Sequence, residues 1–366
     1  MILVAAMALA LQRAEPWDTV SEALRFLARH QRPDGSWGER PGTCTCPRDE
    51  ARAAADAASV TRLLRALDAD DPIARDTAMQ ELRGFDETAL PHLRAAVKDP
   101  DPEIAKVCAA LCRRLELATK GAGDVELTAL ALLAFLGAGY SPLSKDVYDG
   151  VPIGPAAQKG LEWLAARQKG TGAFDAKDPV ADAVAALATS EAFGLTNRES
   201  LKEDAQKGIG RIAAAEMKET RGLVWKGMAL KSAEISGLTV ARTAAADNFK
   251  ALAARKDATA EAAYPMISIF HHRNQQDPRL SAIGNLDPDR LGTEDLYFAD
   301  LGVFQYDGPK GTLWKAWLVR IKERVLPGQV SGKQLCSRGS WDGIGLRGRL
   351  RGTALQGLMF EIYYNH

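Results

Sequence analysis

The sequence predicts an all-α protein built from repeated helical hairpins. Alanine- and leucine-rich stretches with helical spacing dominate its 366 residues, whereas runs of β-branched residues are few and strict alternation never lasts. Glycine, proline and aspartate interrupt these stretches at short intervals, for example at Gly35, Pro41-Gly42 and Gly237. Many medium-length helices joined by short breaks are typical of paired helices, and therefore of repeat proteins.

The overall composition is that of an ordinary folded protein. Hydrophobic residues make up 46%, aromatic residues 7% and charged residues 26% of the chain. The 47 lysines and arginines balance the 47 aspartates and glutamates, so net charge gives no reason to expect nucleic acid or an anionic membrane as partner. We expect no nucleic-acid partner and no integral membrane segment.

The apolar run from Ile2 to Leu11 is too short to span a bilayer. It has the length of a signal-peptide core and an A-x-A-like end at Ala8-Leu9-Ala10, although no basic residues precede it. We expect residues 1–12 to be a signal peptide and the protein to be exported to the periplasm or cell envelope. The alternative is a short apolar first helix of a cytoplasmic protein.

One turn motif occurs twice, and its turn half recurs near the C-terminus at Trp341. A glutamine that ends a helix can bond exposed backbone groups, a glycine then permits a tight turn, and an aromatic ring folds back over the amide. Both full copies read aromatic-Leu-x3-Gln and then Gly-x-aromatic, with Gln31, Gly35 and Trp37 in the first and Gln168, Gly172 and Phe174 in the second.

These segments resemble the QW repeats of squalene cyclases and other triterpene cyclases, which the prenyltransferase superfamily shares in weaker form. More narrowly, the layout resembles planctomycete-type proteins with prenyltransferase and squalene-oxidase repeats, whose last helix ends in Tyr-Tyr as Tyr363-Tyr364 does here. The resemblance implies an α/α toroid, a closed ring of helical hairpins, with residues 17–47 as its first repeat and 119–366 as the remainder. Such a fold hosts many activities, so it implies architecture rather than chemistry.

Residues 48–118 have a different pattern and predict a short HEAT-like helical insertion in the first ring repeat. Helices here are separated by Asp-Pro turns; Pro102 suits the first turn of a helix, and Asp99 or Asp101 can cap it. Solenoid units of this kind bind other macromolecules, but so few repeats form little concave surface. We expect the insertion to pack on the ring.

Neither catalytic pattern of the related enzymes is intact. The string Asp68-Ala69-Asp70-Asp71 spells the D-x-D-D by which squalene–hopene cyclases protonate their substrate, and that chemistry needs a buried acid facing an apolar cavity. Here the string precedes Pro72, where aspartates cap a solvated turn. The candidates for a prenyltransferase zinc site do not match that family's spacing: Asp295 or Asp300, Cys336, and His271 or His272. We therefore expect no catalytic residue and no cofactor.

Four early cysteines leave three interpretations open. Cys44 and Cys46 lie in a Gly/Pro loop, and Cys108 and Cys112 share one face of a helix at i and i+4. Together they could hold a structural zinc, which makes them weak metal candidates, or a disulfide could join loop and helix. We favour thiols, because this spacing is unusual for zinc.

Arg347, Arg349 and Arg351 alternate just before a helix expected to begin near Thr353. Because helix N-termini and arginines attract anions, these three are candidates to bind phosphate or sulfate. A solvated loop face is the alternative. The overlapping G-x-G-x-x-G string at 343–348 follows no strand, so it predicts no dinucleotide site.

If the ring encloses a ligand cavity, a few polar and aromatic residues are candidates to line it, with core packing as the alternative for the aromatic ones. These candidates are Asp182, Tyr297, Asp300, Gln305 and Trp314.

Three functional classes follow, and we favour the first. It is a non-enzymatic binding or scaffolding protein of the cell envelope, with an unknown protein or an apolar ligand as partner. The alternative is an isoprenoid- or lipid-handling enzyme of the squalene cyclase or prenyltransferase type. A third class, acting on polysaccharide, would need paired carboxylates, for which Asp182, Asp295 and Asp300 are the candidates.

Overall fold

Helices with two different burial patterns make up most of the protein. The computed structural model describes residues 16–38, 57–69, 71–83, 89–119, 123–175, 177–272, 278–332, 336–341 and 345–364. Within these ranges the strands are β1 (Val147–Tyr148) and β2 (Val151–Pro152), which form one antiparallel hairpin. The prediction of a mostly helical, all-α protein is confirmed.

The first group of helices occupies the centre of the main body. In α7 every residue from Val125 to Leu136 is buried, and α9 is buried almost throughout from Val180 to Phe193. Helices that are apolar all round are stable only when other elements surround them. The group consists of α7 (Asp124–Gly137), α9 (Pro179–Thr196), α11 (Thr220–Ile235), α13 (Ala258–His272), α14 (Thr293–Asp307) and α16 (Gly345–Tyr364).

The second group is amphipathic and covers the first. In α10 the buried residues include Leu201, Ala205 and Ile212, which fall on one face, while the other face is exposed. The group consists of α2 (Pro16–Arg29), α8 (Ile153–Arg167), α10 (Glu199–Ala214), α12 (Ala244–Ala253) and α15 (Thr312–Val325). Short 3-10 helices η2 (Pro278–Asn285), η3 (Pro288–Arg290) and η4 (Leu326–Gly328) connect later elements.

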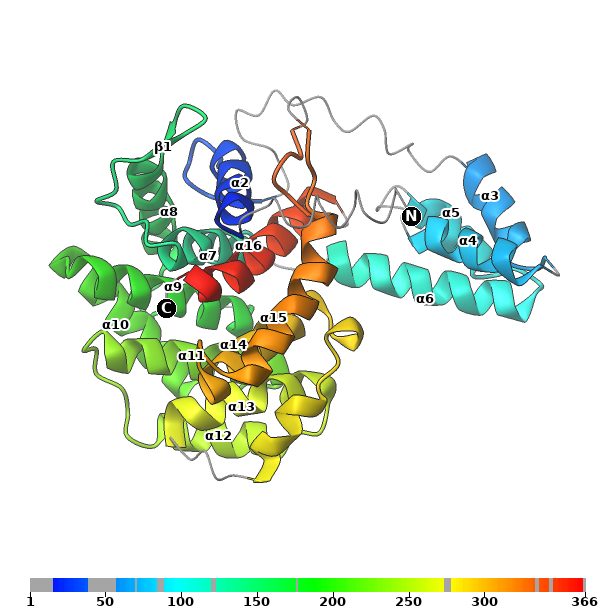
Figure 1. The fold of residues 1–366 in the computed structure, drawn as a ribbon. Coiled ribbons are helices and arrows are strands. Elements are labelled where there is room, and N and C mark those ends of the chain that lie inside the picture. Colours follow the sequence, from blue (N-terminus) through cyan, green and yellow to red (C-terminus); the bar gives the residue numbers. More distant parts are fainter. Residues whose placement is uncertain are drawn as a thin grey trace.

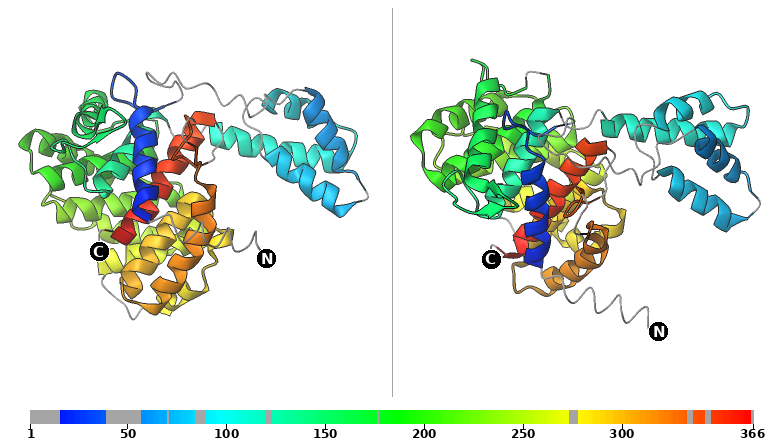
Figure 2. Two further views of the ribbon diagram at one scale, coloured as in Figure 1. Left: turned by 45° about the horizontal axis from the view of Figure 1, so that its top comes forward. Right: turned by 90° about the horizontal axis from the view of Figure 1, so that it is seen from above.

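The central helices contact one another in a closed circuit. Contacts run from α7 through α9, α11, α13 and α14 to α16, and α16 in turn contacts α7. The outer helix α2 also packs along α16, so the first and last described helices lie side by side (Figures 1 and 2). The remaining outer helices pack on the circuit, with α8 on α7, α10 on α9, α12 on α11 and α15 on α14.

Three equivalent turns join neighbouring outer helices. The side-chain amide of Gln31 donates to the carbonyl oxygens of Gly35, in its own turn, and Ala156, at the start of α8. Gln168 does the same with Gly172 and with Asp204 on α10. The third turn closes the circuit: Gln329 donates to Gly339 and to Thr19 on α2.

The glycine of each turn allows the close approach. Gly35, Gly172 and Gly339 all have positive φ, of 92°, 82° and 86° respectively. A Cβ on Gly172 would lie only 2.3 Å from the carbonyl oxygen of Lys207, and the other two face the next outer helix in the same way. Only glycine combines that backbone conformation with that contact.

Helices α3 (Ala57–Ala66), α4 (Pro72–Arg83), α5 (Leu90–Ala96) and α6 (Pro102–Thr119) have a hydrophobic cluster of their own. Leu82 and Leu93 are at its centre, and none of its residues belongs to the cluster of the main body. Figure 1 shows these helices beside the main body, with α6 extending toward it. Asp101 caps α6, because its Oδ1 accepts a hydrogen bond from the amide of Glu103 at 2.8 Å.

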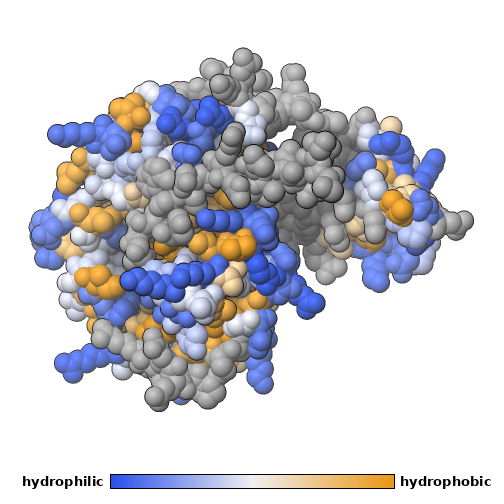
Figure 3. All heavy atoms as spheres, in the orientation of Figure 1, coloured by the Kyte–Doolittle hydropathy of each residue, from blue (hydrophilic) through white to orange (hydrophobic). Residues whose placement is uncertain are grey.

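Polar and apolar residues alternate in small patches over the described part of the face in Figure 3. Within the described ranges, no helix combines the length and the apolar character needed to cross a membrane.

Candidate functional site

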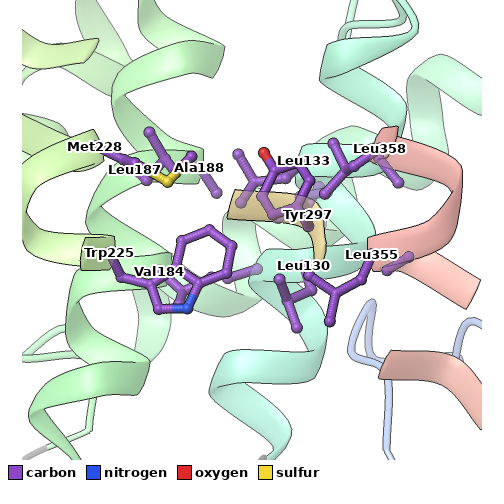
Figure 4. Close-up of a cluster of buried hydrophobic side chains, with 14 of the residues drawn as sticks. Leu130, Leu133, Val184, Leu187, Ala188, Trp225, Met228, Tyr297, Leu355 and Leu358 are labelled. Atoms are coloured by element: carbon purple, nitrogen blue, oxygen red, sulfur yellow. The ribbon is translucent and has the colours of Figure 1, made fainter. Parts of the chain in front are cut away.

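The middle of the helical circuit is filled by side chains. Trp225 on α11 and Tyr297 on α14 stack with ring centroids 5.9 Å apart, and Trp225 is completely buried. Figure 4 shows aliphatic side chains from the surrounding helices packed about these two rings: Leu130, Leu133, Val184, Leu187, Leu355 and Leu358. The space between the central helices at the level of these two rings is therefore packed core.

A pocket of about 580 Å³ lies on one side of this core. Its wall comes largely from the last turns of α7, α9, α11 and α13, together with the middle of α14. The volume is within the usual range of small-ligand sites, about 300–1,000 Å³. Most of the lining is apolar; the lining residues are Leu136, Leu187, Glu191, Gly194, Leu195, Asn197, Met228, Lys231, Ser232, Ile235, Ser236, Phe270, Tyr297 and Leu301.

Carboxyl groups without counter-ions gather at this pocket. Glu191 lines it, and burial raises the pKa of Glu191 to about 7. Glu361 on α16 is 2% exposed, and neither of its carboxyl oxygens has a hydrogen-bond partner among the described residues. Burial, and then the charge of Glu191, raise the pKa of Glu361 well above its usual value.

Two more titratable groups lie on α14, near these acids. Asp300 is buried; its Oδ1 accepts a hydrogen bond from Nε1 of Trp317 at 2.8 Å, and burial raises its pKa to about 8 against the effect of that bond. Burial raises the pKa of Tyr297, and the charges of Glu191, Glu361 and Asp300 raise it further. Burial therefore biases Glu361 and Asp300 toward their neutral forms at neutral pH, whereas Glu191, with a pKa of about 7, is close to half ionised there.

The opposite end of the circuit carries charges that are paired. Arg221 on α11 donates to Glu126 on α7 and, at 2.9 Å through both Nε and Nη2, to Glu294 on α14. Arg351 on α16 contacts the same two carboxylates, at 3.3 Å from Glu126 and 2.8 Å from Glu294. Trp225 adds a bond from Nε1 to Glu294 at 2.8 Å. The two arginines and two glutamates thus link four central helices.

This pairing explains the ionisation of Glu294. Burial alone would raise the pKa of its carboxyl, but the charges of Arg351 and Arg221, together with the hydrogen bonds from Arg221 and Trp225, lower it to about 2. A second pocket, of about 660 Å³, lies at this end beside the first turns of α11, α13 and α14, and Arg221, Glu294 and Arg351 line it. Both arginines are already bound to carboxylates.

The structure separates the five sequence-predicted cavity residues. Only Tyr297 lines the 580 Å³ pocket. Asp182 instead accepts hydrogen bonds on Oδ1 from the amides of Phe174 and Asp175, at 2.8 and 2.7 Å, and so fixes a turn. Asp300 is buried against Trp317, and Trp314 is buried edge-on to Phe304 at 5.1 Å; the half-buried Gln305 does not line the pocket.

The predicted anion-binding arginines have protein partners. Nη2 of Arg347 lies 3.1 Å from Asp124, Nη1 of Arg349 donates to the hydroxyl of Ser340 at 2.9 Å, and Arg351 belongs to the pairing described above. The carboxylates beside Arg347 and Arg351 neutralise the positive charge that would attract phosphate or sulfate, whereas Arg349 bonds to a neutral hydroxyl.

The polysaccharide candidates do not converge. Asp182 serves a turn at the start of α9, Asp295 lines the pocket at the arginine end, and Asp300 is buried one turn further along α14. In the D-x-D-D string, Asp68 and Asp71 are exposed, Asp71 caps α4 through a bond from the amide of Ile73, and Asp70 lies outside the described residues.

The favoured interpretation, thiols, holds for the two cysteines of the helix. Cys108 and Cys112 are buried thiols on α6, so the disulfide from the early loop to this helix is wrong. Cys336 is disulfide-bonded, and its partner lies outside the described residues, as do Cys44 and Cys46. The described residues contain no group of three or more histidine, cysteine or acidic side chains suited to a metal, and the side chains of His271 and His272 are also outside them.

Sequence reasoning missed the acids of the pocket and the paired charges at the opposite end. One signal was present: Glu191 and Glu361 are single charges within long apolar helical stretches, and Glu126, two positions after Asp124, begins another such stretch. A charge in such a stretch must be paired, neutralised or placed at a cavity. Comparisons of the chain with protein-family models, curated proteins and solved structures found no match.

Proposed function

We propose that this chain is a non-catalytic binding protein whose pocket at the C-terminal ends of the central helices takes a small apolar ligand. We further propose that it is an α/α toroid of the squalene-cyclase and prenyltransferase type, with α3–α6 as a HEAT-like insertion. The closed circuit of contacts supports the toroid. The filled interior supports binding rather than cyclisation, because an extended triterpene needs the space that Trp225, Tyr297 and their neighbours occupy.

The observation that carries the ligand proposal is the 580 Å³ pocket with its mainly aliphatic wall. Export to the cell envelope is part of the same proposal. The disulfide at Cys336 supports it, because structural disulfides persist mainly in oxidising compartments.

The alternative is an isoprenoid- or lipid-handling enzyme. It is favoured by the raised pKa of Glu191, which lines the apolar pocket, since a general acid needs a raised pKa. Product analysis by mass spectrometry after incubation with polyprenyl substrates separates the two: new products would support the enzyme, and their absence together with saturable binding would support the binding protein.

Calorimetric titration with 1-decanol tests the binding proposal. We expect saturable binding to one site, and loss of at least tenfold in affinity in a Ser232→Trp variant, because Ser232 lines the pocket and an indole would fill it. Lys202→Trp, on the exposed face of α10, is the control and should bind like the wild type. Absence of saturable binding, or equal binding by Ser232→Trp, would contradict the proposal.

A further inference from the structure

The C-terminal ends of four central helices meet at the 580 Å³ pocket. Leu136, Leu195, Ile235 and Phe270 line it, and each lies within the last turn of α7, α9, α11 or α13. The last carbonyl groups of α7 and α11 accept hydrogen bonds from the residues that follow, such as Phe135 from Tyr140 and Ala233 from Leu238. The helix dipole nevertheless places about half a negative charge at each such end. Four such ends create a negative potential in the pocket before any side chain is considered.

The carboxyl group of Glu191 reinforces this potential when it is ionised. Glu191 lies in the wall, and the buried carboxyl of Glu361 lies beside the end of α7, where a Cβ on Gly137 would be 2.2 Å from its Oε2. The one cation in the described lining is Lys231, whose Nζ is 3.2 Å from Oε2 of Glu234 on its own helix. Among the described lining residues, Glu191 is therefore the one carboxyl group, and it has no lysine or arginine partner.

We propose that the ligand of this pocket is a cationic amphiphile, with an ammonium group bound by Glu191 and an apolar body against Leu187, Met228 and Phe270. This inference rests on the proposed function of the pocket and specifies its ligand class. An ammonium group supplies three hydrogen-bond donors and a charge opposite to that of the helix ends and of ionised Glu191.

A neutral ligand with a hydroxyl group would satisfy the site less well. Its oxygen could accept one hydrogen bond from a protonated Glu191, but it would lie at the negative ends of the four helices. A carboxylate ligand would meet the same potential with a full negative charge. Electrostatics therefore orders the three head groups as amine, alcohol and acid.

The test compares 1-aminodecane, 1-decanol and decanoic acid by calorimetric titration of the full chain at pH 7.5, below their micelle concentrations. We expect 1-aminodecane to bind at least tenfold more tightly than 1-decanol, and decanoic acid to bind more weakly than either. In Glu191→Gln the preference for the amine should fall below about threefold, while the affinity for 1-decanol should stay within about twofold. A tenfold preference corresponds to about 1.4 kcal/mol. Glu199→Gln, which removes an exposed charge on α10, is the control.

The pH dependence gives a second readout. The amine prefers ionised Glu191, and burial raises the pKa of Glu191 to about 7. The affinity for the amine should therefore rise from pH 5.5 to pH 8, by up to tenfold per pH unit below pH 7. The other titratable groups near this position are Lys231 on α11, Tyr297 on α14 and Glu361 on α16, and Asp300 acts in turn on Tyr297. Affinity for 1-decanol should change little over the same range.

The outcomes separate the two proposals. If 1-decanol binds as tightly as 1-aminodecane, or if Glu191→Gln keeps the full preference, the amine inference is wrong while the pocket remains an apolar binding site. If none of the three compounds binds saturably, the proposed function itself is wrong, and the inference falls with it.

Discussion

The hydroxyl of Thr128 accepts a hydrogen bond from the backbone amide of Trp37 at 3.0 Å, although 91 positions separate the two residues. Thr353 and Trp341 make the equivalent bond at 3.3 Å within a continuous stretch of chain. The turn at Trp37 therefore contacts α7 as the turn at Trp341 contacts α16. In the first case residues 39–122 lie in the sequence between the turn and its helix. Gly38 and Asp124, at the borders, are in contact, because a Cβ on Gly38 would be 2.5 Å from Oδ1 of Asp124.

Residues 39–122 should be removable. We expect a chain in which about five glycine and serine residues join Gly38 to Gly123 to fold cooperatively, because such a linker spans more than the gap and α3–α6 have a separate core. Its circular dichroism should remain helical and its Tm should approach that of full-length Cys336→Ser. That variant is the control, since the deletion also removes Cys44 and Cys46. Loss of cooperative unfolding would show that the two parts fold together.

Gly172→Ala should destabilise the protein strongly. The new Cβ would lie 2.3 Å from the carbonyl oxygen of Lys207 at a position with φ of 82°, so we expect a loss of about 2 kcal/mol or more in the free energy of unfolding. Gly170→Ala is the matched control: nothing lies within 4 Å of its Cβ, and the change should stay within about 0.5 kcal/mol. Urea unfolding of both variants measures the difference, and equal effects would contradict the close packing of this turn.

Glu294→Gln should break the paired charges at the arginine end. It leaves Arg221 and Arg351 to share Glu126, and removing one partner from a buried ion pair costs about 3–5 kcal/mol. The pKa of Glu294 is lowered to about 2, so its stabilisation is complete above the unfolded pKa near 4.3 and is lost as pH falls toward 2.

The wild type should therefore lose its advantage over Glu294→Gln between about pH 4.5 and pH 2. Thermal unfolding at a series of pH values measures this. Glu234→Gln removes a half-exposed charge that pairs with Lys231 and should cost less than about 1 kcal/mol at any pH. A constant difference between wild type and Glu294→Gln would contradict the depressed pKa.

Asp300→Asn should have the opposite pH dependence. Burial raises the pKa of Asp300 to about 8, so between its unfolded pKa near 3.9 and pH 8 the folded protein holds a proton that the unfolded chain has released. The stability of the wild type should consequently fall as pH rises, by up to about 1.4 kcal/mol per pH unit from this group. Asparagine keeps the acceptor for Trp317 but does not titrate, so the variant should gain on the wild type between pH 5 and pH 8. Asp68→Asn, in an exposed turn, should run parallel to the wild type.

Cys336 should be found in a disulfide with a peptide containing Cys44 and Cys46, the two cysteines of the sequence that remain after the thiols Cys108 and Cys112. Peptide mapping without reduction tests this. Alkylation of the unfolded, unreduced chain should label Cys108 and Cys112 fully. A bond from Cys336 to either of these two would contradict the structure.

The sequence by itself determined the local elements of this protein. The Gln31 and Gln168 motifs, the positive-φ glycines and the fully apolar stretch of α7 are encoded within short segments, because helix ends and tight turns depend on neighbouring residues. The same reasoning identified the Trp341 turn but missed Gln329, since the leading part of the motif is absent there.

Only the tertiary structure decided which polar groups are satisfied. Asp182 and Glu361 are both acids in apolar helices, yet one bonds two turn amides and the other has no partner among the described residues. Arg351 was a candidate for an external anion, but Glu126 and Glu294, more than 50 positions away, already hold it. The free energy of a buried charge depends on partners brought by distant helices, and no local pattern specifies these.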